Sequence, residues 1–305
     1  MLTNTVLMNT MLTPQAIRAV VEPALAEDAP WGDVTSELLI SADATATAVL
    51  SAREQGVLSG GAVFAEAMTA VDPALSISLT RADGESFEKG TTLGTVTGNA
   101  RSILRAERVA LNLVQRMSGI ATLTARYVAE VRGTAARVVD TRKTTPGLRA
   151  LERHAVRSGG GHNHRFSLSD AVLAKDNHLA VLVADGQDLT EALRDARSRL
   201  SHTTHFEVEV DRIDQIEPVI SAGIDTIMLD NFSLDELREG VALVAGRALV
   251  EASGNVNLDT IRTIAETGVD IISVGALTHS VHALDLGLDV RLNGVEADGR
   301  EAARP

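Results

Sequence analysis

The chain of 305 residues contains no cysteine, and only 2% of its residues are aromatic. The absence of cysteine excludes disulfide frameworks, zinc sites with thiolate ligands and cysteine nucleophiles. With so few aromatic rings, the core must be built from aliphatic side chains. The apolar fraction of 45% is nevertheless typical of a globular protein.

Long apolar runs are also missing, because no segment approaches the roughly 18 residues that a membrane-spanning helix needs. The N-terminal stretch lacks the basic start and the continuous apolar segment of a signal peptide. We therefore expect a cytoplasmic protein that does not associate with membranes. Residues 1–12 are predicted to be a flexible extension, in which Met1, Met8 and Met11 are alternative starts.

Basic residues are in the minority, with 28 Lys and Arg against 41 Asp and Glu, yet they gather in one stretch. The stretch from Asp140 to Arg165 reads DTRKTTPGLRALERHAVRSGGGHNHR. A surface for nucleic acid and a pocket for a small anionic substrate would both explain such a cluster. The net charge of −13 argues against nucleic acid, because proteins that bind it usually carry a basic field.

The N-terminal part of the chain predicts a small α+β domain over residues 13–120. A helix is expected from about Pro14 to Glu27, with Thr13 as its N-cap. Short strand-like runs broken by glycines follow, and then a long helical stretch that is interrupted at Gly119. The C-terminal segment over about 283–305 is expected to pack back on this domain.

After residue 133, apolar strand-like runs alternate with helical patterns. The six runs are ARVVD (136–140), AVLAKD (171–176), HFEVEVD (205–211), DTIMLDN (225–231), ALVEASGN (248–255) and DIISVGA (270–276). This alternation predicts parallel strands joined by crossover helices in a catalytic domain over residues 121–282. The strands could close into an α/β barrel or form an open doubly wound sheet. No G-x-G-x-x-G motif follows the first run and no P-loop is present, which weakens the second alternative.

Polar residues or glycines stand at the carboxyl end of every one of these runs. In chain order they are Arg142, Lys143, Lys175, Glu209, Asp230, Ser253, Gly254, Asn255, Gly275 and Ala276. In barrel enzymes the carboxyl ends of the strands form the rim that carries the active site. We therefore expect these residues to meet in one site.

Simpler interpretations exist for several of the polar residues in the basic stretch. His162 and His164 are only a weak candidate for a metal site, since no carboxylate or thiolate is close to them in the sequence. The triplet 159–161 is interpreted as a helix C-cap and flexible loop. Three arginines that recur every four residues are interpreted as the solvated face of a helix: Arg149, Arg153 and Arg157.

The residue types on the expected rim suit a substrate that carries both carboxylates and phosphates. Arginine binds carboxylates in a bidentate manner, and backbone N–H groups at glycine turns before helices bind phosphate. Glu209 and Asp230 would accept sugar hydroxyls, hold Mg²⁺ or stabilise positive charge on a ribose. We expect Glu209 to point into the site and Glu207 to lie on the opposite side of the same strand.

Longer motifs resemble those of the quinolinate phosphoribosyltransferase family, whose members are also called carboxylating nicotinate-nucleotide pyrophosphorylases. They occur in order over nearly the whole chain: WGDVTSELL, GVLSGG, RAERVALNLVQRMSGIATLT, the basic stretch itself, AKDNH, EVEVD, IMLDNF, EASGNV and ISVGALTHS. The resemblance implies an incomplete, TIM-like parallel α/β barrel of about seven strands with a smaller α+β N-terminal domain. It also implies a homodimer whose active sites combine the barrel of one subunit with the N-terminal domain of the other.

The activity that the resemblance implies is phosphoribosyl transfer from phosphoribosyl pyrophosphate to quinolinate with decarboxylation, which gives nicotinate mononucleotide for NAD biosynthesis. Mg²⁺ is the implied cofactor, held by Glu209 and Asp230 directly or through water, and the implied catalytic residues are these two acids with Lys143 and Lys175. The implied quinolinate ligands are Arg108, Thr141, Arg142, His164, Arg165 and Lys175. The implied phosphoribosyl pyrophosphate ligands are Lys143, Glu209, Asp230, Ser253, Gly254, Asn255, Val274, Gly275 and Ala276.

Three alternatives stay open at this point. A related phosphoribosyl-type enzyme could act on another aromatic acid, although the matched arginines and histidine argue for a dicarboxylate. A Schiff-base barrel lyase would use Lys143 or Lys175 as its nucleophile. A nucleotide-sensing protein on a degenerate scaffold is disfavoured by the complete set of charged residues. The resemblance assigns no role to His162.

Overall fold

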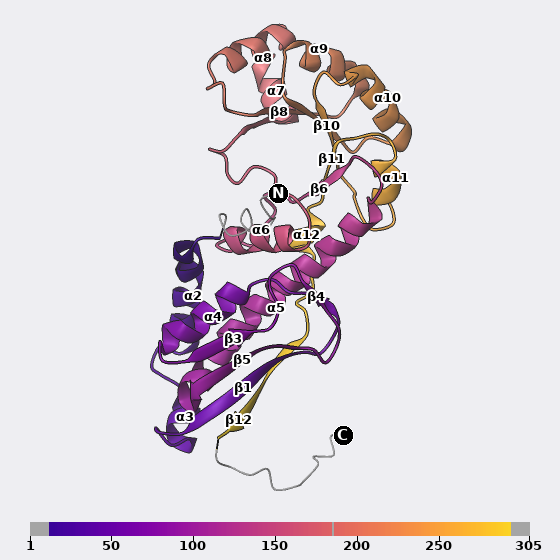
Figure 1. The fold of residues 1–305 in the computed structure, drawn as a ribbon. Coiled ribbons are helices and arrows are strands. Elements are labelled where there is room, and N and C mark those ends of the chain that lie inside the picture. Colours follow the sequence, from indigo (N-terminus) through magenta and orange to yellow (C-terminus); the bar gives the residue numbers. More distant parts are fainter. Residues whose placement is uncertain (1–11, 185, 294–305) are drawn as a thin grey trace. The chain divides into compact units, whose positions relative to one another are not determined.

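The computed structural model describes residues 12–184 and 186–293, and it divides the chain into two compact units (Figure 1). The first unit comprises the described residues up to Gly119 together with those from His282 onward, and the second comprises Ile120–Val281. The alternative starts Met1, Met8 and Met11 lie outside the described residues. Leu12 is buried, so the expected flexible extension does not include this residue.

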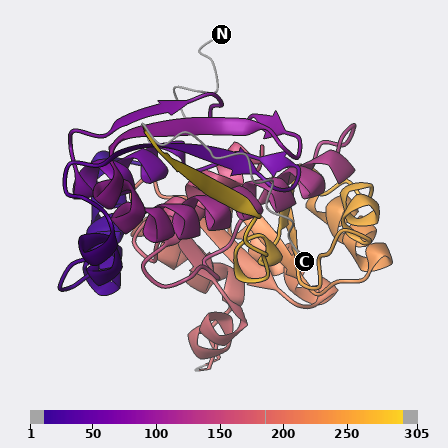
Figure 2. The same ribbon diagram turned by 90° about the horizontal axis from the view of Figure 1, so that it is seen from below.

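The first unit is built on an antiparallel sheet with strand order β12-β1-β5-β3, and α5 runs along one face of it (Figures 1 and 2). A two-stranded ribbon joins β2 to β4. The elements of this unit are α2 (Pro14–Asp28), α3 (Val34–Leu39), β1 (Thr45–Ala52), β2 (Gly56–Val57), α4 (Gly61–Val71), β3 (Ser76–Leu79), β4 (Ser86–Phe87), β5 (Thr92–Asn99), the first part of α5 (Ala100–Glu130) and β12 (Leu286–Leu292). Because β12 pairs with β1, the C-terminal segment completes the sheet of the N-terminal unit.

The first helix begins where the sequence predicts. The side chain of Thr13 accepts a hydrogen bond from the backbone N–H of Ala16 at 3.2 Å, which satisfies one of the unpaired donors at the start of α2. Pro14 follows at the first helical position, where its missing N–H costs nothing.

The expected interruption at Gly119 is wrong, because α5 is continuous from Ala100 to Glu130. The glycine is needed for a close approach of two chain segments. A Cβ at this position would collide with the backbone carbonyl oxygen of His282. The backbone N–H of Leu284 also donates to the carbonyl of Gln115 at 2.9 Å, so the chain leading to β12 lies directly against this helix.

The variant Gly119→Ala is therefore expected to lower the free energy of unfolding by about 1–3 kcal/mol, the usual cost of overpacking. The sign of the change is decisive, because Gly→Ala in an ordinary helix interior stabilises by about 0.5–1 kcal/mol. Urea unfolding followed by circular dichroism measures the difference. A stabilised variant would show that the close approach to His282 does not constrain this position.

The second unit contains the predicted parallel sheet, with strand order β6-β11-β10-β9-β8-β7. All six strands coincide with the runs recognised in the sequence, and α8 to α11 lie outside the arc that they form (Figure 1). The elements are β6 (Arg137–Val139), α6 (Arg149–Ser158), β7 (Val172–Ala174), α7 (Asp176–Leu182), α8 (Leu189–Ser198), β8 (Phe206–Val210), η1 (Ile213–Gln215), α9 (Ile216–Ser221), β9 (Thr226–Asp230), α10 (Leu234–Val244), β10 (Leu249–Ser253), α11 (Ile261–Ala265), β11 (Ile271–Ser273) and α12 (Ala276–His279).

Within the described residues the parallel sheet has six strands, where the resemblance implies about seven, and one isolated bridge extends it beyond β6. His162 forms an isolated parallel bridge with Val139 at the free edge of β6. Its backbone N–H donates to Val138 at 2.8 Å and its carbonyl accepts from Asp140 at 3.1 Å. The predicted C-cap in the triplet 159–161 is present, because Gly159 caps α6. The residue after the triplet is fixed to the sheet, and this backbone pairing is the structural role of His162.

Alternate positions on the strands face the inside of the arc, which corrects the expectation for Glu207. Residues two apart in a strand point to the same face, so Glu207 and Glu209 lie on one side of β8. Glu207 is only 4% exposed, and its neighbours Phe206 and Val208 are buried hydrophobic residues.

None of the helices in the described part of the chain is long and apolar enough to cross a membrane.

Candidate active site

A cavity of about 400 Å³ opens at the carboxyl ends of the strands of the second unit. Nine residues predicted from the sequence line it: Thr141, Arg142, Lys143, His164, Arg165, Lys175, Glu209, Asp230 and Ser253. Three further lining residues were not predicted: Leu173, Met228 and Ser273. Predicted polar residues at or after the carboxyl ends of β6 to β10 thus line one cavity, whereas Gly275 and Ala276, predicted after β11, are not among its lining residues.

The predicted glycine turns lie beside this cavity rather than on its lining. Gly254 adopts a φ of +91°, and a Cβ there would collide with Asn231, so only glycine fits the turn after β10. The side-chain amide of Asn255 donates to the Asn231 side chain at 3.1 Å and holds the turn. Gly275 lies against the side chain of Lys143, whose Cδ would be 3.1 Å from an added Cβ.

Two further residues predicted for the site, Val274 and Arg108, do not line the cavity. Val274 is buried and its backbone N–H donates to the carbonyl of Val139 at 2.9 Å, so this N–H belongs to the sheet and is not available to a phosphate. In the VGA turn, the backbone groups of Gly275 and Ala276 remain as the candidates. Arg108 belongs to the first unit, where it is exposed on α5.

Two arginines present unsatisfied donors at the cavity. The Nε atoms of Arg142 and Arg165 are buried and have no hydrogen-bond partner in the described structure. Arg165 Nη1 donates to the carbonyl of Ala171 at 2.9 Å, which fixes the direction of its guanidinium. Burial, and then the neighbouring charge of Arg142, lower the pKa of Arg165. Two like charges side by side, with buried donors unmet, form a site that an anionic ligand would complete.

The acids of the cavity lie close to the lysine and amide groups. Lys175 Nζ lies 2.6 Å from Glu209 Oε2, and Glu209 is the more enclosed partner, with 13% of its side chain exposed against 47% for Lys175. Asp230 Oδ2 accepts a hydrogen bond from the side-chain amide of Asn231 at 2.7 Å. The lysine ammonium is therefore held by a carboxylate, a poor arrangement for a Schiff-base nucleophile, which must be uncharged to attack.

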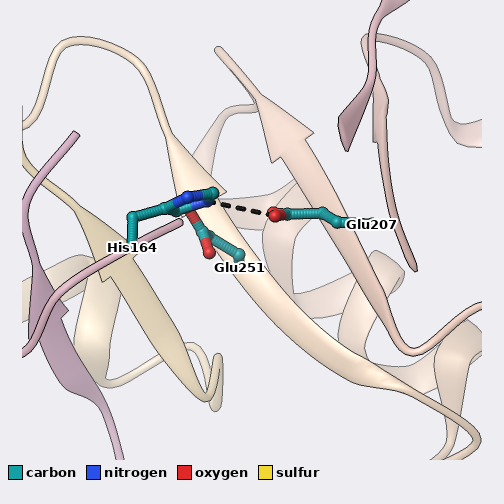
Figure 3. Close-up of side chains that lie close together, drawn as sticks. All are labelled: His164, Glu207 and Glu251. Atoms are coloured by element: carbon teal, nitrogen blue, oxygen red, sulfur yellow. Dashed lines mark ion pairs between the residues drawn. The ribbon is translucent and has the colours of Figure 1, made fainter. Parts of the chain in front are cut away.

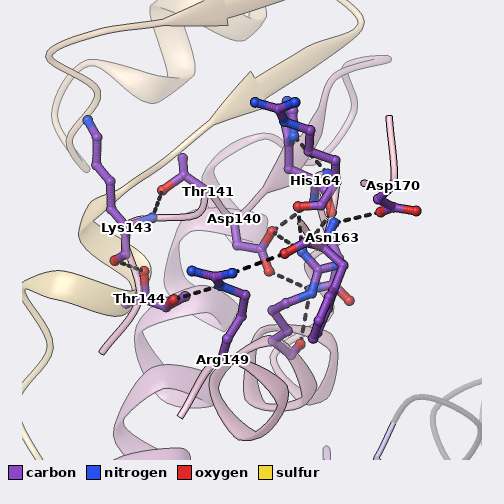
Figure 4. A network of polar contacts seen from close by, with 12 residues as sticks. Asp140, Thr141, Lys143, Thr144, Arg149, Asn163, His164 and Asp170 are labelled. Carbon is purple, nitrogen blue, oxygen red and sulfur yellow. Dashed lines mark hydrogen bonds and ion pairs between the residues drawn. The ribbon is translucent and has the colours of Figure 1, made fainter. Parts of the chain in front are cut away.

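Asp140 is fully buried below the rim and holds the basic stretch together (Figure 4). Its carboxylate accepts from the backbone N–H of His164 at 2.8 Å and from the side-chain amide of Asn163 at 2.6 Å. It also pairs with Arg153 at 3.4 Å. Burial raises the pKa of Asp140, while the Arg153 charge and these hydrogen bonds act in the opposite direction.

The interpretation of Arg149, Arg153 and Arg157 as a solvated helix face is wrong for Arg153. This side chain is only 4% exposed, and it donates to the backbone carbonyl of His164 at 2.6 Å. It therefore links α6 to the segment that carries two of the cavity-lining residues. Helical periodicity could not reveal this contact, because it depends on how the segment from Asp140 to His164 folds back against α6.

Below the cavity His164 contacts two buried glutamates that the sequence reasoning did not select, Glu207 and Glu251 (Figure 3). Among the residues that the structure describes, these three are the one group of three or more His, Asp or Glu side chains whose ligand atoms all lie within 4.8 Å of one another. His162 does not belong to this group. The suggested metal site of His162 with His164 is thus not formed within the described part of the chain.

The family models that match the chain correspond to both units. The C-terminal domain of quinolinate phosphoribosyl transferase matches residues 120–289, and the N-terminal domain of the same enzyme matches residues 33–118. The chain belongs to the quinolinate phosphoribosyltransferase family. The boundary between the two matches falls where the structure divides the chain.

Relatives within the quinolinate phosphoribosyltransferase family span nearly the whole chain. It is 42% identical to the carboxylating nicotinate-nucleotide pyrophosphorylase of Mycobacterium leprae, over 90% of this chain and 97% of the relative. The chloroplastic enzyme of Arabidopsis thaliana is 40% identical, with 94% and 86% covered. The crystal structure of NadC from Streptococcus pyogenes superimposes with a TM-score of 0.87 at 39% identity, covering 92% of this chain and 98% of that one.

Proposed function

We propose that this protein transfers the phosphoribosyl group of phosphoribosyl pyrophosphate to quinolinate, with loss of CO₂, to form nicotinate mononucleotide for NAD biosynthesis. The observation that carries the proposal is the pair of buried, unpartnered Nε donors of Arg142 and Arg165 on one cavity. A planar guanidinium binds a carboxylate through two parallel hydrogen bonds. Two adjacent guanidinium groups therefore suit an aromatic acid with two adjacent carboxylates.

The other side of the cavity suits the phosphorylated sugar. Lys143 is exposed next to the turn at Gly275, and Ser253 precedes the turn at Gly254. A lysine ammonium and glycine-turn N–H groups are both common phosphate ligands. Quinolinate would thus lie over the arginines, with the pyrophosphate and the 5′-phosphate toward Lys143 and the two turns.

Glu209 and Asp230 fit a magnesium ion, because both place carboxylate oxygens on the cavity that receives the pyrophosphate. Mg²⁺ prefers hard oxygen donors, and it is commonly held by one or two carboxylates together with substrate phosphates. When bound, the ion would neutralise the pyrophosphate as it leaves. The two acids themselves would accept ribose hydroxyls and stabilise the positive charge that develops at C1′.

The enzyme is further proposed to be a homodimer in which Arg108 reaches the quinolinate of the other subunit. Arg108 is exposed on α5 in the first unit, as a residue with a partner in another subunit should be. The cytoplasmic location also stays a prediction.

Mixing Arg108→Ala protein with Lys143→Ala protein is expected to restore activity to a pair of variants that are each inactive. In the hybrid dimer one of the two sites carries neither substitution, so up to about half the sites of the hybrid are intact. The measurement is nicotinate mononucleotide formation after subunit exchange, with exchange itself followed by mass spectrometry. Exchange without recovered activity would contradict a site shared between subunits.

The substrate assignment is tested by supplying quinolinate or nicotinate with phosphoribosyl pyrophosphate and Mg²⁺. Product is expected from quinolinate, and turnover of nicotinate should be lower by roughly 10²-fold or more, since a buried guanidinium would lose its carboxylate. Chromatography of the nucleotide products measures both rates. Comparable rates on the two acids would favour a related phosphoribosyl enzyme instead.

A further inference from the structure

A buried cluster beneath the cavity joins His164 to two glutamates that have no part in the chemistry proposed above. His164 Nε2 lies 3.0 Å from Glu207 Oε2 and 3.6 Å from Glu251 Oε1, and the three side chains come from separate segments of the chain (Figure 3). Exposure of the two glutamate side chains is 5% and 2%, whereas His164 reaches the cavity lining. We refer to these three residues as the His164–Glu207–Glu251 cluster.

The hydrogen bonds of the imidazole fix how the ring is used. Its Nδ1 accepts the backbone N–H of Arg165 at 2.7 Å, so the ring proton is on Nε2 and is donated to Glu207. Burial alone lowers the pKa of His164, but the hydrogen bond to Glu207 and the charge of Glu251 raise it overall. A second proton on Nδ1 would nevertheless face the N–H of Arg165, so the geometry favours the singly protonated ring.

A metal ion does not suit this cluster, although three ligand atoms converge there. An ion on Nε2 would displace the ring proton while Nδ1 still accepts from Arg165, which leaves an anionic imidazolate. Metal-bound histidines instead donate their other N–H to a neighbouring acceptor. The cluster is better explained as a support for the residue that follows His164.

Negative charge in the cluster matters because it lies beneath a pocket for anions. The polar groups that face Glu251 are Glu207 on β8, His164 on the loop after α6 and Ser273 on β11. On the neighbouring strand β9, the residue paired with Glu251 is the uncharged Met228. Burial, reinforced by the charge of Glu207, raises the pKa of Glu251 to about 8, against the effects of His164 and Ser273. At neutral pH Glu251 is therefore mainly protonated, so it adds little negative charge beneath the pocket.

We propose that Glu207 and Glu251 are positioning residues for the substrate carboxylates, acting through His164 on Arg165. The carboxylate of Glu207 holds the imidazole, and the imidazole holds the backbone N–H of Arg165, whose guanidinium lines the cavity. Glu251 completes the cluster in its protonated form, so that it adds no negative charge beneath the cavity that would repel a dianionic substrate. The inference rests on the proposed function only in naming quinolinate as the dianion.

Steady-state kinetics between pH 6.5 and 9 test the proposal with Glu207→Gln, Glu251→Gln and, as a control, Glu239→Gln on the exposed face of α10. We expect Glu207→Gln to raise KM for quinolinate roughly tenfold at pH 7, the effect of losing a hydrogen bond to a charged group, with kcat changed less than about twofold. Glu251→Gln should resemble the wild type at pH 7, because glutamine mimics the protonated acid.

The pH profile separates positioning from a merely structural role. In the wild type, KM for quinolinate should rise above a pH of about 8, where Glu251 loses its proton, and this rise should be absent from Glu251→Gln but kept by Glu239→Gln. An equal alkaline rise in Glu251→Gln would overturn the proposal. So would a loss of kcat with unchanged KM in the Glu207 variant.

Thermal unfolding of the intact protein supplies a readout that needs no turnover. The folded pKa of Glu251 is raised from 4.5 to about 8, so the stability that this group contributes is lost as the pH rises through that range, and Glu251→Gln lacks this contribution. The Tm of the variant minus that of the wild type should therefore grow from pH 5 to pH 8. A constant difference would overturn the role of Glu251 even if nicotinate mononucleotide is formed. A stoichiometric metal retained by the wild type and lost from Glu251→Gln would overturn it as well.

Discussion

Glu209→Gln and Asp230→Asn are each expected to lower kcat by roughly 10²-fold or more, while the KM for quinolinate stays the same or falls. Both acids lie on a cavity whose other charged residues attract anions, so their own charges weaken the binding of the quinolinate dianion. Their benefit comes when positive charge develops at C1′ of the ribose and when the magnesium-bound pyrophosphate leaves. The loss of one preorganised electrostatic group has this magnitude.

Steady-state kinetics at saturating phosphoribosyl pyrophosphate separate the two outcomes, because a group that acts only in the transition state lowers kcat and kcat/KM together. Glu207→Gln is unsuitable as the control, since Glu207 lies on the same face of β8 and is buried against His164. Asp211→Asn is better, because Asp211 follows β8 directly and 56% of its side chain is exposed. It should keep nearly full activity. If Glu209→Gln and Asp230→Asn raised only KM, their assigned role would be wrong.

Asp140→Ala is expected to lower the free energy of unfolding by about 3–5 kcal/mol, the usual effect of removing one partner of a buried ion pair. The substitution would leave the Arg153 guanidinium buried without its carboxylate, and the backbone N–H of His164 without its acceptor. Because Arg165 follows directly, the KM for quinolinate should also rise in the protein that remains folded. Urea unfolding at pH 7 measures the first effect and kinetics below the transition measure the second.

The matched control is an ion pair on the surface. Arg262 and Glu266 lie 2.6 Å apart on α11 and the residue after it, with 45% and 50% of their side chains exposed. Glu266→Ala should change the free energy of unfolding by no more than about 0.5 kcal/mol, because exposed pairs are screened by solvent. Similar losses in the two variants would show that Asp140 is not the centre of a buried network.

The strands and their carboxyl ends were predictable because two simple signals coincide there. Each strand of the second unit is an apolar, β-branched run, and polar residues such as Lys175, Glu209 and Asp230 stand where the run ends. Parallel strands bring those ends together whatever the details of packing. The position of the site on the rim could therefore be predicted from the order of apolar runs and polar residues along the chain.

The two buried glutamates below the rim were not predicted, because finding them requires knowing which alternate positions of each strand face the inside of the sheet. Glu207 and Glu251 lie two residues before Glu209 and Ser253, and so face the same interior. A charged residue between apolar neighbours in a central strand was the available signal. The close approach at Gly119 had no such signal, since it depends on a segment more than 160 residues away in the sequence.

The most direct test of the proposed activity is CO₂ release from quinolinate labelled in the carboxyl group adjacent to the ring nitrogen. We expect one CO₂ for each pyrophosphate formed, and release only when phosphoribosyl pyrophosphate and Mg²⁺ are both present. Arg142→Ala should abolish both products together, because the arginine lines the cavity with a buried unpartnered Nε. CO₂ released without phosphoribosyl pyrophosphate, or pyrophosphate released without CO₂, would contradict the account.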